Sequence, residues 1–201
     1  MGMFLNPDDI QLRDDRCNPF YVDKSLIIRE MNNIVRQKSD KFICVSRPRR
    51  FGKTMAANMI AAYYSKGCDS HELFSDLKIS KDPSYEENIN KYAVIQLDMN
   101  DVVTRKGTSS VSSFINSIVV PELREEYPSI NLMDNIDIPG AIQAIYKGTG
   151  DRFVFIIDEY DVIIRDQKYS SELDGYLTCL VSLFKNSATA PAISLAYLTG
   201  I

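Results

Sequence analysis

A short basic segment of the chain has the residue types that bind phosphate groups. Residues 46–54 read SRPRRFGKT and stand between an apolar run and an amphipathic stretch, the place for a loop between a strand and a helix. Such a site needs backbone N–H groups at a helix start, a lysine that reaches the β- and γ-phosphates of a nucleotide, and a hydroxyl for Mg²⁺. Gly52, Lys53 and Thr54 supply these parts.

The match to a phosphate-binding loop is incomplete, because Arg47 occupies the place of the first glycine in G-x-x-x-x-G-K-[ST]. A bulky residue there limits how tightly the loop can turn. On this segment alone, an ordinary helix start after a solvated basic loop stays an alternative.

A second segment, residues 153–159, is an apolar run that ends in two acids, FVFIIDE. A carboxylate at the carboxyl end of a buried parallel strand, beside a phosphate loop, can hold Mg²⁺ directly or through water, and we assign this role to Asp158. Glu159 would orient or deprotonate an attacking water. By itself this segment could be a strand that ends in a polar turn. Because it follows the basic loop in the chain, in the order that a nucleotide site requires, the two segments together favour a nucleotide site.

The three arginines of the basic loop have several readings. They could bind triphosphate oxygens, reach a developing charge as arginine fingers do, hold the loop against acidic neighbours, or simply be solvated. We include the arginines and two apolar neighbours in the predicted nucleotide-binding set, which within this segment comprises Arg47, Arg49, Arg50, Phe51, Gly52, Lys53, Thr54 and Met55.

Apolar patterning predicts the elements that would position these residues. Four runs are apolar throughout, which is typical of strands buried on both faces of a parallel sheet, and amphipathic stretches alternate with them. We therefore predict an α/β fold of three layers, with helices on both faces of a mainly parallel sheet. Residues 100–109 are polar and are expected to form a loop. The predicted strands are 42–45, 93–97, 153–158 and 192–198, and the predicted helices are 24–37, one from 53 to about 65, one from 111 that Pro121 kinks or restarts, 138–147 and 173–184.

Composition fits a single domain of 201 residues, with 45% hydrophobic residues and a formal net charge of −4. This charge argues against a chain that binds nucleic acid by bulk electrostatics. No apolar run approaches the roughly 20 residues of a membrane helix, so we expect no membrane partner. The four cysteines form no paired metal-ligand motif, which favours a reducing compartment, with the cytosol as the default. Cys44, in a predicted buried strand, is expected to be a small packing residue.

Four segments together resemble the AAA-ATPase-like family. In that family an arginine-rich phosphate loop is itself the signature. Arg47 therefore differs from the general G-x-x-x-x-G-K-[ST] motif but agrees with the motif of this family. The resemblance covers about residues 19–201, which we treat as one core, with residues 1–18 as an N-terminal extension. The segments are YVDKS at 21–25, SRPRRFGKT at 46–54, ELF at 72–74 and FIIDEYD at 155–161.

The resemblance implies a P-loop NTPase core of the additional-strand type that binds ATP and Mg²⁺. Carried over by position, Lys53 and Thr54 would hold phosphate and metal, Asp158 the metal, and Glu159 the water. The final strand would lie between the strand before the basic loop and the strand before Asp158. Its end would bring Thr199 near the γ-phosphate as a polar sensor, and a strand-end hydroxyl that bonds the backbone is the alternative.

Three further residues have two readings each. Tyr21, just before the first predicted helix, could stack on adenine or pack in the core. Asp161 and Arg165 follow the acidic pair and could form an ion pair or contact a neighbouring subunit.

These features favour Mg²⁺-dependent ATP binding and hydrolysis that drives or gates an attached effector domain, with Lys53, Glu159 and Thr199 as the catalytic set. Glu159 next to Asp158 argues against a small-molecule kinase, which needs no water-activating acid there. A GTPase is disfavoured because no Asn/Thr-Lys-x-Asp motif is present. The alternative is a regulatory module that binds nucleotide or nucleic acid without turnover and uses the arginines as an anion patch.

The resemblance also implies chain beyond residue 201. Relatives usually carry a restriction-endonuclease-like domain further along, so nucleic acid is an expected partner through that domain, and a homo-oligomer is a further candidate. The core of the relatives also continues to a fifth strand beside the strand of the basic loop. We therefore expect a truncated core in which residues 42–45 form an exposed sheet edge, open to another chain or to the N-terminal segment.

Overall fold

The computed structural model describes residues 2–35, 37 and 40–201, and at its centre lies a four-stranded sheet whose strands are all parallel. The strand order is β1-β4-β3-β2, so the last strand lies between the first and the third, as predicted. The strands are β1 (Phe42–Ser46), β2 (Ala93–Asp98), β3 (Phe153–Asp158) and β4 (Ile193–Gly200). The α-helices of the described residues are α1 (Ile10–Arg16), α2 (Leu26–Ile34), α3 (Lys53–Tyr64), α4 (His71–Phe74), α5 (Tyr85–Asn88), α6 (Met99–Arg105), α7 (Val111–Glu126), α8 (Ile138–Thr149), α9 (Val162–Arg165) and α10 (Leu173–Phe184).

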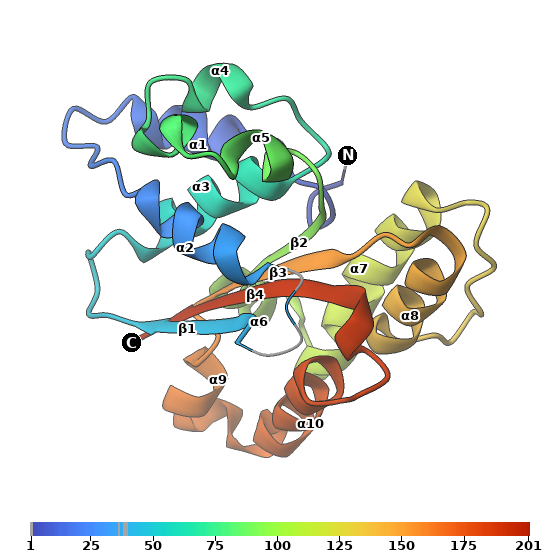
Figure 1. Cartoon of the computed structure of the whole chain (residues 1–201). Helices are drawn as coiled ribbons and strands as arrows, with labels where there is room; N and C mark the ends of the chain where they lie inside the picture. The colour runs from blue at the N-terminus through green and yellow to red at the C-terminus, as the bar shows by residue number, and fades with distance from the viewer. Residues whose placement is uncertain (1, 36, 38–39) are drawn as a thin grey trace.

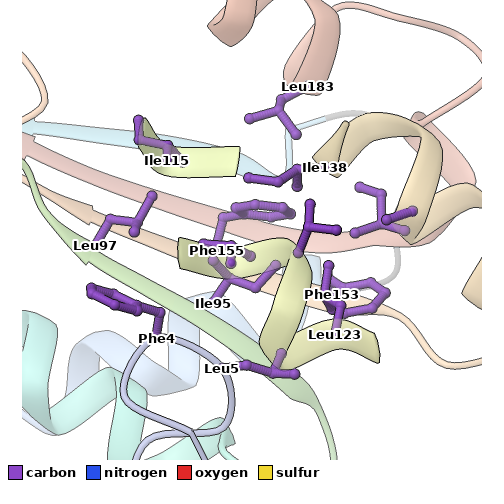
Figure 2. Packing of buried hydrophobic residues seen from close by; sticks show 14 of the residues in the cluster. Phe4, Leu5, Ile95, Leu97, Ile115, Leu123, Ile138, Phe153, Phe155 and Leu183 are labelled. Atoms are coloured by element: carbon purple, nitrogen blue, oxygen red, sulfur yellow. The ribbon is translucent and has the colours of Figure 1, made fainter. Parts of the chain in front are cut away.

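Helices cover both faces of the sheet, α1 to α5 on one face and α6 to α10 on the other (Figure 1). Alternate residues of β3 enter two separate cores. Phe155 and Ile157 pack in the core with α7, α8 and α10, where Phe155 lies near Leu183 (Figure 2), whereas Val154 and Ile156 pack on the side of α3. Full burial of a valine, isoleucine or phenylalanine side chain stabilises the fold by about 1.5–3 kcal/mol. Burial on both faces therefore explains the apolar character of β2, β3 and β4, whereas no residue of β1 is fully buried. The layers confirm the predicted α/β fold with helices on both faces of a parallel sheet.

The N-terminal segment pairs with the β2 edge of the sheet. Leu5 forms an antiparallel bridge with Ile95. The Asn6 backbone N–H donates to the Val94 carbonyl at 2.7 Å, and the Asn6 side-chain oxygen accepts from the Val94 N–H at 3.0 Å. The sequence predicts that the N-terminal segment is one candidate to pair with the β1 edge. In the structure this segment instead covers the β2 edge, at the opposite side of the sheet.

Glu122 on α7 holds this segment in place. Its carboxylate accepts hydrogen bonds from the backbone N–H groups of Met3 and Phe4 at 2.9 Å and of Leu5 at 2.7 Å. Hydrogen bonds to an ionised acceptor are stronger than those between neutral groups. With their amides satisfied, Phe4 and Leu5 pack into the core below α7 (Figure 2).

β1 is an edge strand, because within the described residues only β4 pairs with it. This confirms the expected exposed edge at residues 42–45. Phe42 is 42% exposed and packs edge-on against Phe184. Cys44 is exposed, so its predicted packing role in a buried strand is wrong. A hydrogen bond between the Tyr160 hydroxyl and Cys44 raises the pKa of Tyr160 to about 12.

Helix α6 stands where the sequence predicts a loop at residues 100–109. Asp98 caps this helix by accepting a hydrogen bond from the Asn100 N–H at 2.8 Å. Met99 and Val102 are fully buried, so the polar residues of the segment form the outer face of a helix. The loop prediction is wrong for residues 100–105, because the polar character of a short segment does not reveal one buried stripe, and it is confirmed for residues 106–109.

Other boundaries differ by a few residues. The helix predicted over 24–37 is observed as α2, which ends at Ile34, and residue 36 lies outside the described residues. α7 contains Pro121 and continues to Glu126. α8 ends beyond the predicted residue 147, where Gly150 takes the left-handed conformation with φ of +80°.

The end of β4 passes very close to the turn that follows β3. Tyr160 N–H donates to the Thr199 carbonyl at 2.9 Å, and Ile201 N–H donates to Asp161 Oδ2 at 3.1 Å. A Cβ atom on Gly200 would lie 2.7 Å from Asp161 Oδ1 and 2.9 Å from a ring carbon of Tyr160. Only glycine permits this approach without a shift of the turn.

Replacement of Glu122 by alanine should lower the free energy of unfolding by about 2–3 kcal/mol, because three backbone amides lose a charged acceptor. Urea denaturation of Glu122→Ala measures this loss. Glu125→Ala is the matched control on the same helix, since Glu125 is exposed, and it should change stability by less than about 0.5 kcal/mol. Equal urea midpoints for Glu122→Ala and Glu125→Ala would contradict the role of Glu122 in anchoring the N-terminal segment.

Gly200→Ala should destabilise the protein by about 1–3 kcal/mol, because the added methyl group meets two side chains of the adjacent turn. Gly175→Ala in α10 is the control, since a Cβ there has no atom within 4 Å, and it should stabilise the helix by about 0.5–1 kcal/mol. Thermal or chemical denaturation compares them. A Gly200→Ala variant as stable as Gly175→Ala would show that the turn can move freely.

Candidate functional site

The basic loop connects β1 to α3, the arrangement of strand, loop and helix that the sequence predicts. Gly52 is the N-cap of α3 with φ of +71°, and Arg50 also has a positive φ of 68°. Within the described chain no side chain caps the first turn of α3. The N–H groups of this turn and the positive end of the helix dipole are therefore available to an anion.

Lys53 is buried beneath the loop. Its Nζ donates hydrogen bonds to the carbonyl oxygens of Arg47 at 3.0 Å and Pro48 at 3.3 Å. It also lies 3.4 Å from Oε1 of Glu159, so the ammonium group is charge-paired. A mobile four-carbon stem lets this group exchange loop carbonyls for phosphate oxygens when an anion arrives.

Asp158, at the end of β3, collects hydrogen bonds from three elements. Thr54 Oγ1 donates to Asp158 Oδ2 at 2.6 Å, and Thr199 Oγ1 donates to Asp158 Oδ1. The Glu159 N–H donates to Oδ1 at 3.0 Å and to Thr199 Oγ1 at 3.3 Å. The structure thus brings the predicted residues Thr54, Asp158, Glu159 and Thr199 together, with the Thr199 hydroxyl on the carboxylate.

Asp98 is a further candidate residue that the sequence-based prediction did not include. The parallel register pairs Asp98 at the end of β2 with Asp158 at the end of β3. Partial burial raises the pKa of Asp98, and the negative charge of Asp158 acts in the same direction. The signal in the sequence was an apolar strand that ends in aspartate, the same signal that identified Asp158.

The oxygen atoms at these strand ends fit a hard cation. Thr54, Asp98 and Asp158 line a cavity of about 450 Å³. Hydroxyl and carboxylate oxygens are the donors that Mg²⁺ prefers, and Mg²⁺ uses few protein ligands because it keeps waters and phosphate oxygens. No group of three or more His, Cys, Asp or Glu residues suited to a metal occurs among the described residues.

Glu159 stands between two cations in a strained backbone conformation. Its φ is +52°, which is uncommon for a residue other than glycine. Oε1 faces Lys53, whereas Oε2 accepts a hydrogen bond from Nη2 of Arg165 at 2.6 Å. Arg165 Nε also pairs with Asp161 Oδ2 at 2.9 Å, which is the ion pair that the sequence offered as one reading.

The three arginines of the loop are all exposed. The Arg47 N–H donates to the Gly200 carbonyl at 3.2 Å, which ties the loop to β4. Arg49 lines a cavity of about 700 Å³ that Glu159 also lines, whereas Arg50 lines a different pocket. Arg49 and Arg50 therefore line different cavities.

The pocket that Arg50 lines also includes residues of the N-terminal part of the chain. It has a volume of about 210 Å³, and Tyr21, Phe51, Gly52 and Met55 contribute to its lining. Partial burial raises the pKa of the Tyr21 phenol above its ordinary value. Lys24 Nζ donates to the Phe51 carbonyl at 2.7 Å and connects the segment after Tyr21 to the loop. The predicted residues Tyr21, Phe51 and Met55 are thus gathered around one space.

Among the described residues, no helix is both long and apolar enough to cross a lipid bilayer. The sequence of the chain matches the family AAA-ATPase-like, described as predicted AAA-ATPase, over residues 11–201. No curated protein matches the chain at a significant level. The family match spans nearly the whole chain and both site segments, and it indicates a function connected with ATP. The chain therefore belongs to the AAA-ATPase-like family.

Proposed function

We propose that this protein binds ATP with Mg²⁺ and hydrolyses it. The observation that carries the proposal is the meeting of Lys53, Thr54, Asp158 and Glu159 where the carboxyl ends of β1 and β3 face the start of α3. A cation for phosphate, two oxygen ligands for a metal, and a carboxylate whose Oε1 becomes available to water once Lys53 moves to the phosphates would form a complete set for phosphoryl transfer to water.

The triphosphate would lie over the loop and the first turn of α3. The uncapped amides of that turn would receive the phosphate oxygens. Lys53 would leave the carbonyls of Arg47 and Pro48 and bind phosphate, a change that needs only rotation of its side chain. Arg49 and Arg50 line two different cavities beside the loop and would supply further positive charge.

Thr54 and Asp158 would hold Mg²⁺, with Asp98 close enough to bind one of its waters. When bound, the ion supplies charge neutralisation for the phosphate oxygens. Thr199 shares Asp158 with Thr54, so its hydroxyl would fix the orientation of the carboxylate. In this arrangement Thr199 would act through Asp158, and its sensor role toward the γ-phosphate stays a prediction.

Glu159 would accept a proton from the attacking water. Lys53 faces Oε1, so this oxygen points to the side where the γ-phosphate would lie. A positioned carboxylate typically accelerates such a step by about 10²–10⁴-fold. A kinase would need a second substrate in place of this water, and the predicted hydrolase needs none.

The base and ribose would lie in the pocket beside Tyr21. Its aromatic and sulfur-containing lining suits a flat, apolar base, and Phe51 is 60% exposed at its rim. The pocket shares Gly52 and Phe51 with the loop, and Lys53 and Thr54 follow directly in the chain, so a nucleotide could extend from the pocket over the loop. Tyr21 is then the candidate for stacking on adenine.

The remaining expectations have unequal support. The sheet order β1-β4-β3-β2, with the basic loop after β1, supports the additional-strand P-loop type. Four free cysteines support a reducing compartment such as the cytosol. The attached effector domain, a nucleic-acid target, a homo-oligomer and the division at residue 19 rest on the resemblance and stay predictions.

Glu159→Gln should bind ATP as tightly as the unmodified protein and hydrolyse it at least about 10²-fold more slowly, because the amide cannot accept the proton. Lys53→Ala should lose nucleotide affinity, since it removes the buried cation. Phosphate release and binding of a fluorescent ATP analogue measure the two effects, and Lys147→Ala on the far helix α8 is the control. Unchanged hydrolysis in Glu159→Gln would contradict the catalytic assignment, and binding without turnover in the unmodified protein would favour the regulatory module.

Asp158→Asn should raise the Mg²⁺ concentration needed for half-maximal hydrolysis by about tenfold or more, because it removes a charged ligand. A Mg²⁺ titration at saturating ATP measures this change, and EDTA should abolish turnover of the unmodified protein. Asp134→Asn, far from the strand ends, is the control. An identical Mg²⁺ dependence in Asp158→Asn would remove Asp158 from the metal site.

A further inference from the structure

We propose that Arg165 is a positioning residue that holds Glu159 in its working orientation. This inference rests on the proposed hydrolysis and adds to it a residue outside the two motifs. Arg165 lies at the end of α9, and it contacts the carboxylate that would activate water.

One guanidinium group joins two carboxylates. Arg165 Nη2 lies 2.6 Å from Glu159 Oε2, and its Nε lies 2.9 Å from Asp161 Oδ2. The side chains of Glu159 and Asp161 are only 16% and 10% exposed, whereas that of Arg165 is 30% exposed. The planar fork of arginine can serve both acceptors at once, which the single ammonium group of a lysine cannot do with the same geometry.

Asp161 gives this contact a fixed base. Its Oδ2 also accepts the Ile201 N–H at 3.1 Å, at the end of β4. Its Oδ1 is buried and has no hydrogen-bond partner within the described residues, and it lies against the surface of Gly200. Asp161 therefore cannot rotate outward without breaking its hydrogen bond with the Ile201 N–H. Because Arg165 pairs with Asp161, this contact also restrains the position of the guanidinium group.

The carboxylate of Glu159 needs a partner that holds its orientation, because neither the backbone conformation nor the side chain of Glu159 determines that orientation. Its φ of +52° is unfavourable for a residue with a Cβ, and a glutamate side chain is flexible when free. Lys53 is the other partner, and the proposed function moves it to the phosphates. Arg165 then remains on Oε2 and leaves Oε1 directed toward the phosphate side.

A displacement of a reacting group by about 1 Å can cost 10²-fold in rate. We therefore expect Arg165→Ala to lower kcat for ATP hydrolysis by about 10- to 100-fold, with less than a twofold change in KM. Arg165→Lys should recover part of the rate, because it restores one contact. Arg13→Ala is the matched control, since Arg13 also pairs with an aspartate four residues earlier, on α1.

A double-mutant cycle with Glu159→Gln separates positioning from a general loss of structure. If Arg165 acts through Glu159, Arg165→Ala should slow the unmodified protein and have no further effect in Glu159→Gln. An equal effect in both backgrounds, an unchanged kcat, or a kcat that rises would each overturn the proposal. A raised KM with unchanged kcat would also overturn it, because Arg165 would then bind nucleotide.

The cycle also distinguishes this inference from the proposed function. Wild-type turnover in Glu159→Gln would refute the catalytic glutamate itself. Slow turnover in Glu159→Gln together with normal turnover in Arg165→Ala would refute only the role of Arg165. If Arg165→Ala does not fold, Arg165→Lys in both Glu159 backgrounds gives the same comparison, with a smaller expected fold-change.

Discussion

The buried carboxylate of Asp158 is the group on which the rest of the site depends. It is 4% exposed at the end of β3, where an ionised group is stable only if hydrogen bonds or cations compensate for the lost water. The hydroxyls of Thr54 and Thr199 and the amide of Glu159 provide this compensation. Because these donors belong to α3, β4 and the turn after β3, one carboxylate sets the relative position of three elements.

The same requirement explains two unusual backbone features near it. β4 must lie close to the turn for Thr199 to reach Asp158, and Gly200 is the residue that allows this approach. Glu159 takes a left-handed conformation, which lets its N–H face Asp158 and Thr199 while its side chain faces Lys53 and Arg165. Strain of this kind persists only where surrounding contacts determine the conformation, and here they do.

The sequence predicts the strands and the two motifs well because their signals are local. β3 is apolar throughout since both faces are buried, and the loop from Ser46 to Thr54 is recognisable by residue type. The position of Asp98 beside Asp158 depends on strand register, and the contact of Arg165 with Glu159 depends on a side chain from α9. No single segment of the sequence reveals either. Helix α6 was missed for a related reason, because its buried stripe consists of few residues.

The two edges of the sheet differ in a way that bears on the site. The β2 edge is covered by the N-terminal residues, whose amides Glu122 anchors, so its backbone groups are satisfied within the chain. The β1 edge has a neighbour on one side only among the described residues, and Phe42 is partly exposed there. The basic loop begins where β1 ends, and the Arg47 N–H already pairs with β4. Any strand that paired with β1 would therefore restrict the first residues of the loop and act directly on the candidate phosphate site.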